Sequence, residues 1–287
     1  MKDRLVAQCP GSALSERWNW QLTRCSIIMN VMQPCPDDEF EWIRTRREKP
    51  RARNTPNWKG NFVSQLMPIR FESYAKILHS IEASYKNIDD PHPLTEREIA
   101  VLKIPPCTIL KSFVVSLREE GRGPRIRWKT LAQLLGVPFE PEICHEWFRA
   151  SMEEPICWPR FLSGPDDGNL NAEEFPEVLS ILRAFSGNQD SLFRFAEWAF
   201  TKRNKPLIFR GVLDELPTFL ADKSYRITPE YWWPTDRSWC LCSEFDLKFT
   251  IVGGSKNLIS AVLNNATLEA LEVTPQTRID DSAPMPC

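Results

Sequence analysis

Two pairs of charged residues near the C-terminal end of this sequence have the types and spacing that acid–base chemistry requires. Asp236 and Arg237 are adjacent, and Glu244 and Asp246 follow in the segment WWPTDRSWCLCSEFD. Paired carboxylates can exchange protons with a substrate or hold a cation when they converge in a pocket that shifts their pKa values. The alternative is structural, with Asp236 in a turn and Arg237 paired with one of the later carboxylates. Turns and ion pairs are commoner than catalysis, so these four residues are candidates without an assigned reaction.

Two cysteines in the same segment could add metal ligands. The period of two in a strand places Cys240 and Cys242 on the face that carries the two later carboxylates. A structural zinc site usually takes four ligands in paired clusters, whereas the only remote additions here are Cys144-His145 and Cys157. Buried cysteines are also common in protein cores. The sequence therefore predicts neither a metal site nor a bound cofactor.

Three tryptophans flank the charged residues: Trp232, Trp233 and Trp239. Tryptophan is highly buried on average, so a place in the core is the first expectation for the 11 tryptophans of the chain. Tryptophan also anchors many protein interfaces. These three are therefore the candidate residues for binding a partner.

A double-glycine turn follows the same segment, at Gly253, Gly254 and Ser255. Free backbone N–H groups at the start of a helix can bind an anion, which makes these residues a weak candidate anion site. The pattern matches neither the dinucleotide-binding fingerprint nor a Walker loop. A tight strand-to-helix turn with Ser255 as the N-cap explains it fully.

The helices that must hold these residues are short and carry clear boundary signals. Residues 128–135 have one apolar face, and Gly136 ends that helix. Asn171 and Glu174 form a capping box at the start of a second helix. Thr95 is the N-cap of a third, with a glutamate three residues later.

The strands are expected mainly in the C-terminal half, in the segment 205–216, which has the pattern of a strand followed by a turn, and in 238–252. The segment 71–79 could be either a short helix or a strand. With 24 prolines against 11 glycines, the chain favours loops and short elements over a helical bundle. We therefore expect an α+β fold in a single domain, residues 57–275, with a mixed or antiparallel sheet and several short helices.

Both ends of the chain have little pattern. Residues 1–56 are expected to be a poorly structured extension, and the start is assigned provisionally because Met29 and Met32 follow a patternless stretch. The basic run Arg44–Arg53 could be a nucleic-acid arm, but it lacks interleaved aromatic residues, which favours a solvated lead-in. Residues 276–287 are expected to be an exposed tail.

Composition excludes several functional classes. The formal net charge of -2 argues against a protein that mainly neutralises nucleic-acid phosphate. No apolar run approaches the ~18 residues of a membrane span, and the N-terminus lacks a signal-peptide pattern. Nine cysteines without a regular framework suit reduced thiols. We expect a cytoplasmic protein without nucleic-acid or membrane partners.

Three motifs resemble those of an uncharacterised group of bacterial proteins. They are FExYAxxxH (Phe71 to His79), R-W-x-x-L-A (Arg127 to Ala132) and WWPxDRxW…DLxxTxVGGS (Trp232 to Ser255). The similarity covers roughly residues 57–275 and is most specific in its last third. The resemblance implies a shared fold and a bacterial, cytoplasmic protein, and it implies no activity.

Two classes of function remain open. The first is a non-catalytic interaction or regulatory protein, immunity-like, that presents an acidic surface rimmed by tryptophan to a protein partner. The second is a hydrolase or transferase that uses the carboxylate cluster, with or without a metal ion. The absence of a recognised catalytic motif favours the first class.

Overall fold

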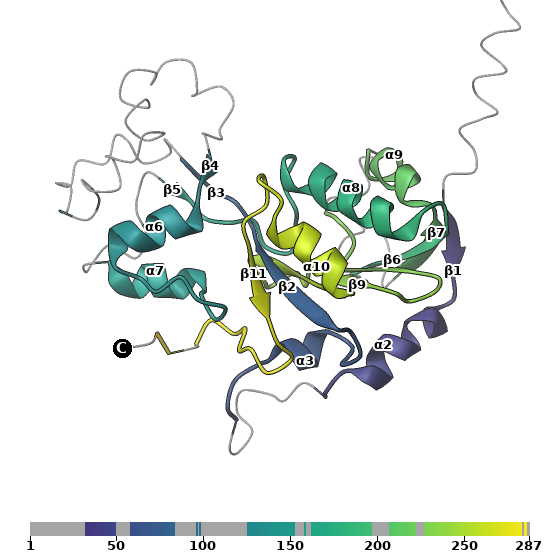
Figure 1. Ribbon diagram of the computed structural model, residues 1–287, viewed down its shortest axis with the longest axis horizontal. Helices are drawn as coiled ribbons and strands as arrows, with labels where there is room; N and C mark the ends of the chain where they lie inside the picture. Colours follow the sequence, from purple (N-terminus) through teal and green to yellow (C-terminus); the bar gives the residue numbers. More distant parts are fainter. Residues whose placement is uncertain are drawn as a thin grey trace, which may run out of the picture.

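The protein is built around one long antiparallel sheet (Figure 1). The computed structural model describes residues 32–49, 58–83, 96, 98, 125–152, 158, 162–196, 207–221, 227–282 and 284–285. The strands of the large sheet are β1 (Gln33–Cys35), β2 (Ser73–Leu78), β6 (Ser191–Phe195), β7 (Leu207–Gly211), β8 (Tyr231–Pro234), β9 (Cys240–Cys242), β10 (Phe249–Gly254) and β11 (Ala270–Val273). Their order is β1-β7-β6-β8-β9-β10-β2-β11, and every neighbouring pair is antiparallel.

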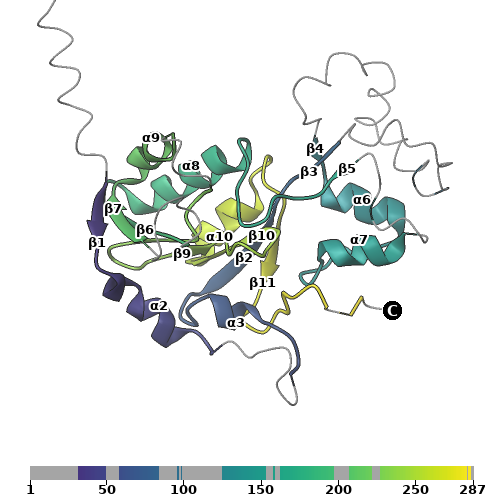
Figure 2. The ribbon, with the colours of Figure 1, turned by 180° about the vertical axis from the view of Figure 1, so that it is seen from behind.

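Helices cover both faces of this sheet (Figures 1 and 2). One face packs against α8 (Glu174–Ser186), α9 (Leu216–Leu220) and α10 (Lys256–Leu263). The core on the other face includes side chains of α2 (Glu41–Arg46), α3 (Val63–Leu66), α6 (Trp128–Leu135) and α7 (His145–Ser151). Short 3-10 turns at Asp37–Phe40 and Leu213–Glu215 precede α2 and α9. The predicted α+β single domain is confirmed, and its large sheet is antiparallel.

A small second sheet continues from the large one. It has the order β4-β3-β5, with β3 at Ile81–Ala83, β4 at Arg125–Ile126 and β5 at Leu162–Ser163. Because β3 follows β2 after two residues, the small sheet lies at one end of β2, next to α6 (Figure 1). Both α6 and α7 lie beyond the β11 edge in both views.

Residue alternation in the C-terminal strands separates the two cores. In β8, Tyr231 and Trp233 belong to the core with α2, whereas Trp232 belongs to the core with α8. In β9, Cys240 and Cys242 face the first core, and Leu241 faces the second. Successive residues of a strand point to opposite faces, so this short stretch contributes large side chains to both layers.

The predicted helix signals are confirmed where the structure describes them. Gly136 ends α6 in the left-handed region, with φ 68°. The Asn171 side chain accepts hydrogen bonds from two backbone N–H groups at the start of α8, one of them that of Glu174, and its own N–H donates to the Glu174 carboxylate. Ser255 accepts a hydrogen bond from Leu258 N at 3.3 Å at the start of α10. The helix start predicted at Thr95 lies outside the described residues.

The expectation of a poorly structured N-terminal extension is wrong within the described residues. Residues 32–49 contain β1 and α2, and they bury Phe40, Trp42 and Ile43 in the core. At the other end, the expected exposed tail is wrong in part: Thr277 and Ile279 are 5% and 3% exposed, whereas the described residues from Asp281 onward are exposed. Both segments are held by contacts with residues far away in sequence, which local pattern cannot show.

The segment 71–79, open to two interpretations, contains strand β2 and ends in a buried histidine. His79 Nδ1 lies 2.7 Å from Asp166 O, and Nε2 lies 2.9 Å from Thr250 Oγ1. Burial lowers the pKa of His79 to about 4. The ring is therefore neutral at physiological pH and has a structural role.

Candidate functional site: an acidic pocket

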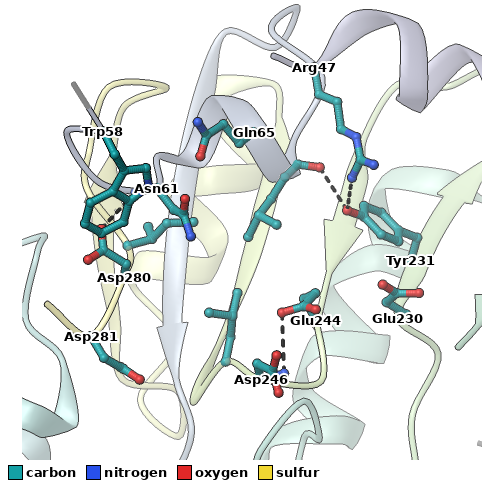
Figure 3. A pocket seen from close by; sticks show the side chains of 13 residues that line it. Arg47, Trp58, Asn61, Gln65, Glu230, Tyr231, Glu244, Asp246, Asp280 and Asp281 are labelled. Atoms are coloured by element: carbon teal, nitrogen blue, oxygen red, sulfur yellow. Dashed lines mark hydrogen bonds between the residues drawn. The ribbon is translucent and has the colours of Figure 1, made fainter. Parts of the chain in front are cut away.

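A cavity of about 600 Å³ opens on the α2 and α3 side of the sheet. Carboxylates from three parts of the chain line it: Glu230, Glu244, Asp246, Asp280 and Asp281. Its other polar and aromatic side chains are Arg47, Trp58, Asn61, Gln65 and Tyr231 (Figure 3). We call this cavity the acidic pocket.

Glu244 and Asp246 reach the acidic pocket because β9 ends at Cys242 and the chain turns. The turn is closed by a hydrogen bond from Leu247 N to Glu244 O at 3.0 Å. Gly168 N donates to Leu247 O at 2.8 Å and supports the turn from outside. Only glycine suits this place, because its φ is +58° and a Cβ would lie 2.5 Å from Phe245 Cα.

The electrostatic environment of Glu244 is unusual. Burial, then repulsion by Asp246 and Glu230, raises the pKa of Glu244 from 4.5 to about 7. Asp246 N donates a long hydrogen bond of 3.4 Å to Glu244 Oε2 (Figure 3). Neither Glu244 nor Asp246 forms an ion pair with any described residue. At neutral pH, Glu244 can therefore hold or release a proton.

The remaining carboxylates of the acidic pocket are held by partners of their own. Glu230 forms an ion pair with Arg194, although burial still raises its pKa. Burial would raise the pKa of Asp280, but hydrogen bonds from Arg278, Ser282 and the Asn61 backbone outweigh it and hold the pKa well below its usual range.

Arg47 and Tyr231 form the upper wall of the pocket in Figure 3. Arg47 Nη1 donates to the Tyr231 hydroxyl at 3.1 Å, and that hydroxyl donates to Leu66 O at 3.1 Å. Arg47 forms no ion pair with a described carboxylate. Arg47 therefore stabilises the charge of Glu244 only through space, without a direct ion pair to Glu244 or Asp246.

Asp236 and Arg237, the other two candidates, lie outside the acidic pocket. Asp236 accepts a hydrogen bond from Ser238 N at 2.9 Å and another from the Gln189 side chain at 3.1 Å. Arg237 has φ 56°, and its guanidinium lies 5.4 Å from the centre of the Trp42 ring. The two residues thus form the β8–β9 turn, and Arg237 pairs with neither pocket carboxylate.

The three candidate binding tryptophans are core residues. Trp232, Trp233 and Trp239 are 0%, 1% and 1% exposed. The indole N–H of Trp232 donates to Pro229 O, and that of Trp239 donates to Ser186 Oγ. Helices cover both faces of their strands, so none of the three can serve as a surface anchor, and the expected binding surface is corrected on this point.

The glycine turn is also accounted for by packing. A Cβ on Gly253 would lie 2.6 Å from the Phe71 ring and 2.9 Å from the ring of Tyr74 on strand β2, so the packing of these rings requires glycine there. Lys256 N, the first N–H of α10, donates to Glu72 Oε2 at 3.0 Å. A carboxylate of the protein itself therefore occupies the place where Gly253, Gly254 and Ser255 were expected to bind an anion.

The cysteines and carboxylates of the SWCLCSEFD segment do not converge. Cys240 and Cys242 are fully buried free thiols within the core. In the described part of the chain, neither joins a group of three metal-ligating side chains. Strand β9 and its alternation end at Cys242, so Glu244 and Asp246 do not share the face of the two cysteines and line the acidic pocket instead.

Sequence reasoning missed Arg47, Trp58, Glu230, Asp280 and Asp281 as pocket residues. The sequence assigns Arg47 to the extension and the last two to the tail, and Trp58 lies next to the extension. Glu230 lies two residues before the signature segment, and this proximity is the one signal that the sequence offers.

No family model matches this chain, and comparisons with curated proteins and with solved structures found no similar protein. None of the described helices is long and apolar enough to cross a membrane. The acidic pocket must therefore be interpreted from its own chemistry.

Proposed function

We propose that the protein is a non-catalytic binding module whose acidic pocket accepts a basic side chain of a protein partner. The observation that carries the proposal is that Glu244 and Asp246 line the pocket without an ion-pair partner among the described residues. Two carboxylates at the same site can accept the N–H donors of one guanidinium in a charge-assisted manner. A basic side chain would supply the missing counter-charge.

The size of the pocket supports a peptide ligand rather than a bare ion. A volume of about 600 Å³ is within the range of ligand pockets and exceeds the volume of one guanidinium. The net charge of -2 favours a basic partner, because complementary charge accelerates association. These features are consistent with a regulatory or immunity-like role.

Calorimetric titration with two matched peptides tests this function. The first is a pentapeptide with one central arginine, and the second carries citrulline, which has the same shape without the charge. Charge-assisted hydrogen bonds contribute about 1.5–3 kcal/mol each, so we expect a Kd on the order of 1 mM for arginine. Equal binding of both peptides, or none by about 10 mM, would contradict the proposal.

The affinity for the arginine peptide should depend on pH through Glu244. Its pKa of about 7 means that the carboxyl is neutral below pH 7, and a cation must expel the proton to bind the carboxylate. The affinity should therefore rise as the pH is raised through 7 and level off above it. Titrations at a series of pH values check this, and Glu244→Gln should abolish the dependence.

A second candidate function is hydrolysis or group transfer by general acid–base catalysis. The observation that favours it is the pKa of about 7 at Glu244, close to the ideal for a proton-transferring group at neutral pH. Turnover of p-nitrophenyl glycosides, esters or phosphodiesters with a pH profile centred near 7 would support it. Activity that survives Glu244→Gln would refute this assignment.

We also propose that the protein acts in the bacterial cytoplasm and belongs to the uncharacterised group that its motifs resemble. The free thiols of Cys35, Cys144, Cys240 and Cys242 support a reducing compartment. Each of the three motifs contributes a buried aromatic residue to the core: Tyr74 on β2, Trp128 on α6 and Trp232 on β8.

A further inference from the structure

We propose that His145, Glu146 and Asp281 form a binding site for a divalent transition-metal ion, with Zn²⁺ the best-suited ion. One ring nitrogen of His145 and one carboxylate oxygen from each acidic residue lie within 4.8 Å of one another. Imidazole and carboxylate together suit Zn²⁺ and its neighbours in the first transition row. The sequence alone predicts no metal site, because His145 enters there only as a remote addition to the ligands Cys240 and Cys242.

The site is assembled from two distant segments. His145 and Glu146 are the first two residues of α7, and Asp281 lies in the C-terminal segment. His145 Nε2 is 2.9 Å from Glu146 Oε1, and Nδ1 is 3.5 Å from Asp281 Oδ1. Because the two carboxylates contact different ring nitrogens, one ion can bind all three residues only after a side-chain rotation that brings one nitrogen and two oxygens to the ~2.0–2.2 Å that a zinc ion requires.

The state of the histidine provides the second observation. Its side chain is only 12% exposed, and the buried Nδ1 makes no hydrogen bond of normal geometry, only the 3.5 Å contact with Asp281 Oδ1. Buried polar atoms are almost always satisfied, so this long contact requires an explanation. A metal ion bound between Nδ1 and Asp281 Oδ1 would bridge the two atoms.

The charges at the site are compatible with a bound cation. Arg149 Nη1 holds Glu146 Oε1 at 2.7 Å, which orients that carboxylate and competes for one of its two oxygens. Asp281 also lines the acidic pocket, so the ion would lie at the pocket rim. Three protein ligands leave a fourth position for water or a ligand, as in catalytic zinc sites.

Calorimetric titration of the chelator-treated protein with Zn²⁺ tests the proposal. We expect one ion per chain, and at least a tenfold loss of affinity in His145→Ala and in Asp281→Asn. Cys144→Ser is the matched control, since it removes the nearest thiol and should leave the affinity unchanged. Asp214→Asn, an exposed carboxylate elsewhere, controls for surface binding.

The spectrum of the Co²⁺-loaded wild-type protein keeps the test valid if a variant fails to fold. Nitrogen and oxygen ligands give visible d–d bands without the near-ultraviolet charge-transfer band of thiolates. No stoichiometric binding to the wild type, unchanged affinity in folded His145→Ala, or a thiolate band would each overturn the site. The arginine-peptide titration is a separate experiment, so the two proposals can fail independently.

Discussion

Trp233→Ala is expected to destabilise the protein by about 3–5 kcal/mol. Trp233 is 1% exposed, and its ring packs edge-on against Trp42 with ring centroids 6.1 Å apart. It also contacts Phe40, at 5.9 Å. Removing the indole leaves a cavity between β8 and α2 that the strand and the helix cannot both collapse to fill. Since whole domains are stable by only about 5–15 kcal/mol, this is a large fraction of the total.

Thermal unfolding followed by circular dichroism measures the effect of Trp233→Ala. At about 2–4 °C per kcal/mol for a protein of this size, the Tm should fall by roughly 6–20 °C. Phe185→Ala is the matched control, because Phe185 is 39% exposed on α8 and should change stability by no more than about 0.5 kcal/mol. A wild-type Tm for Trp233→Ala would show that this ring is not part of the core.

The double substitution Glu244→Gln and Asp246→Asn is expected to weaken binding of the arginine peptide strongly. Each side chain keeps its shape and loses its charge, so the guanidinium keeps its hydrogen-bond acceptors but loses the attraction of two carboxylates. A loss of about 1.5–3 kcal/mol corresponds to about a 10–100-fold weaker Kd. Calorimetry under the wild-type conditions measures it.

Two further variants sharpen this result. Asp236→Asn removes a carboxylate from the same segment outside the acidic pocket, so it should bind like the wild type. Arg47→Met removes a pocket cation that helps to keep Glu244 ionised and competes for it. At pH 8, above the pKa of Glu244, the affinity of Arg47→Met for the arginine peptide should equal or exceed that of the wild type. Wild-type affinity in the double variant, or loss of affinity in Asp236→Asn, would show that the arginine peptide binds outside the acidic pocket.

Local sequence pattern was sufficient for the elements whose signals are local. Gly136 and the Asn171 capping box mark helix ends through backbone conformation and hydrogen bonds within a few residues. Alternation in WCLC likewise predicts that Cys240 and Cys242 share one face, because the strand period depends only on the backbone.

The acidic pocket could be predicted only in part, because its walls meet through long-range contacts. Glu244 and Asp246 were candidates by residue type, and both line the pocket. Arg47 reaches Tyr231 across 184 positions, and Asp280 binds Asn61 N across 219. No periodicity relates residues so far apart.

The tryptophans show a different limit. A Trp-rich strand is compatible with one covered face or with two, and the sequence does not state which helices cover it. Helices α2 and α8 lie on opposite faces of β8 and bury Trp233 and Trp232 respectively. Helix α2 lies within residues 1–56, which the sequence predicts to be a poorly structured extension, and its end overlaps the basic run Arg44–Arg53.

A crystal structure of the protein with the arginine pentapeptide at saturating concentration tests the central claim most directly. We predict guanidinium density in the acidic pocket, within hydrogen-bonding distance of the carboxylates of Glu244 and Asp246, with the backbone of the pocket unchanged. Peptide density at another surface, or a pocket without the guanidinium under conditions where calorimetry shows saturation, would contradict the proposed function.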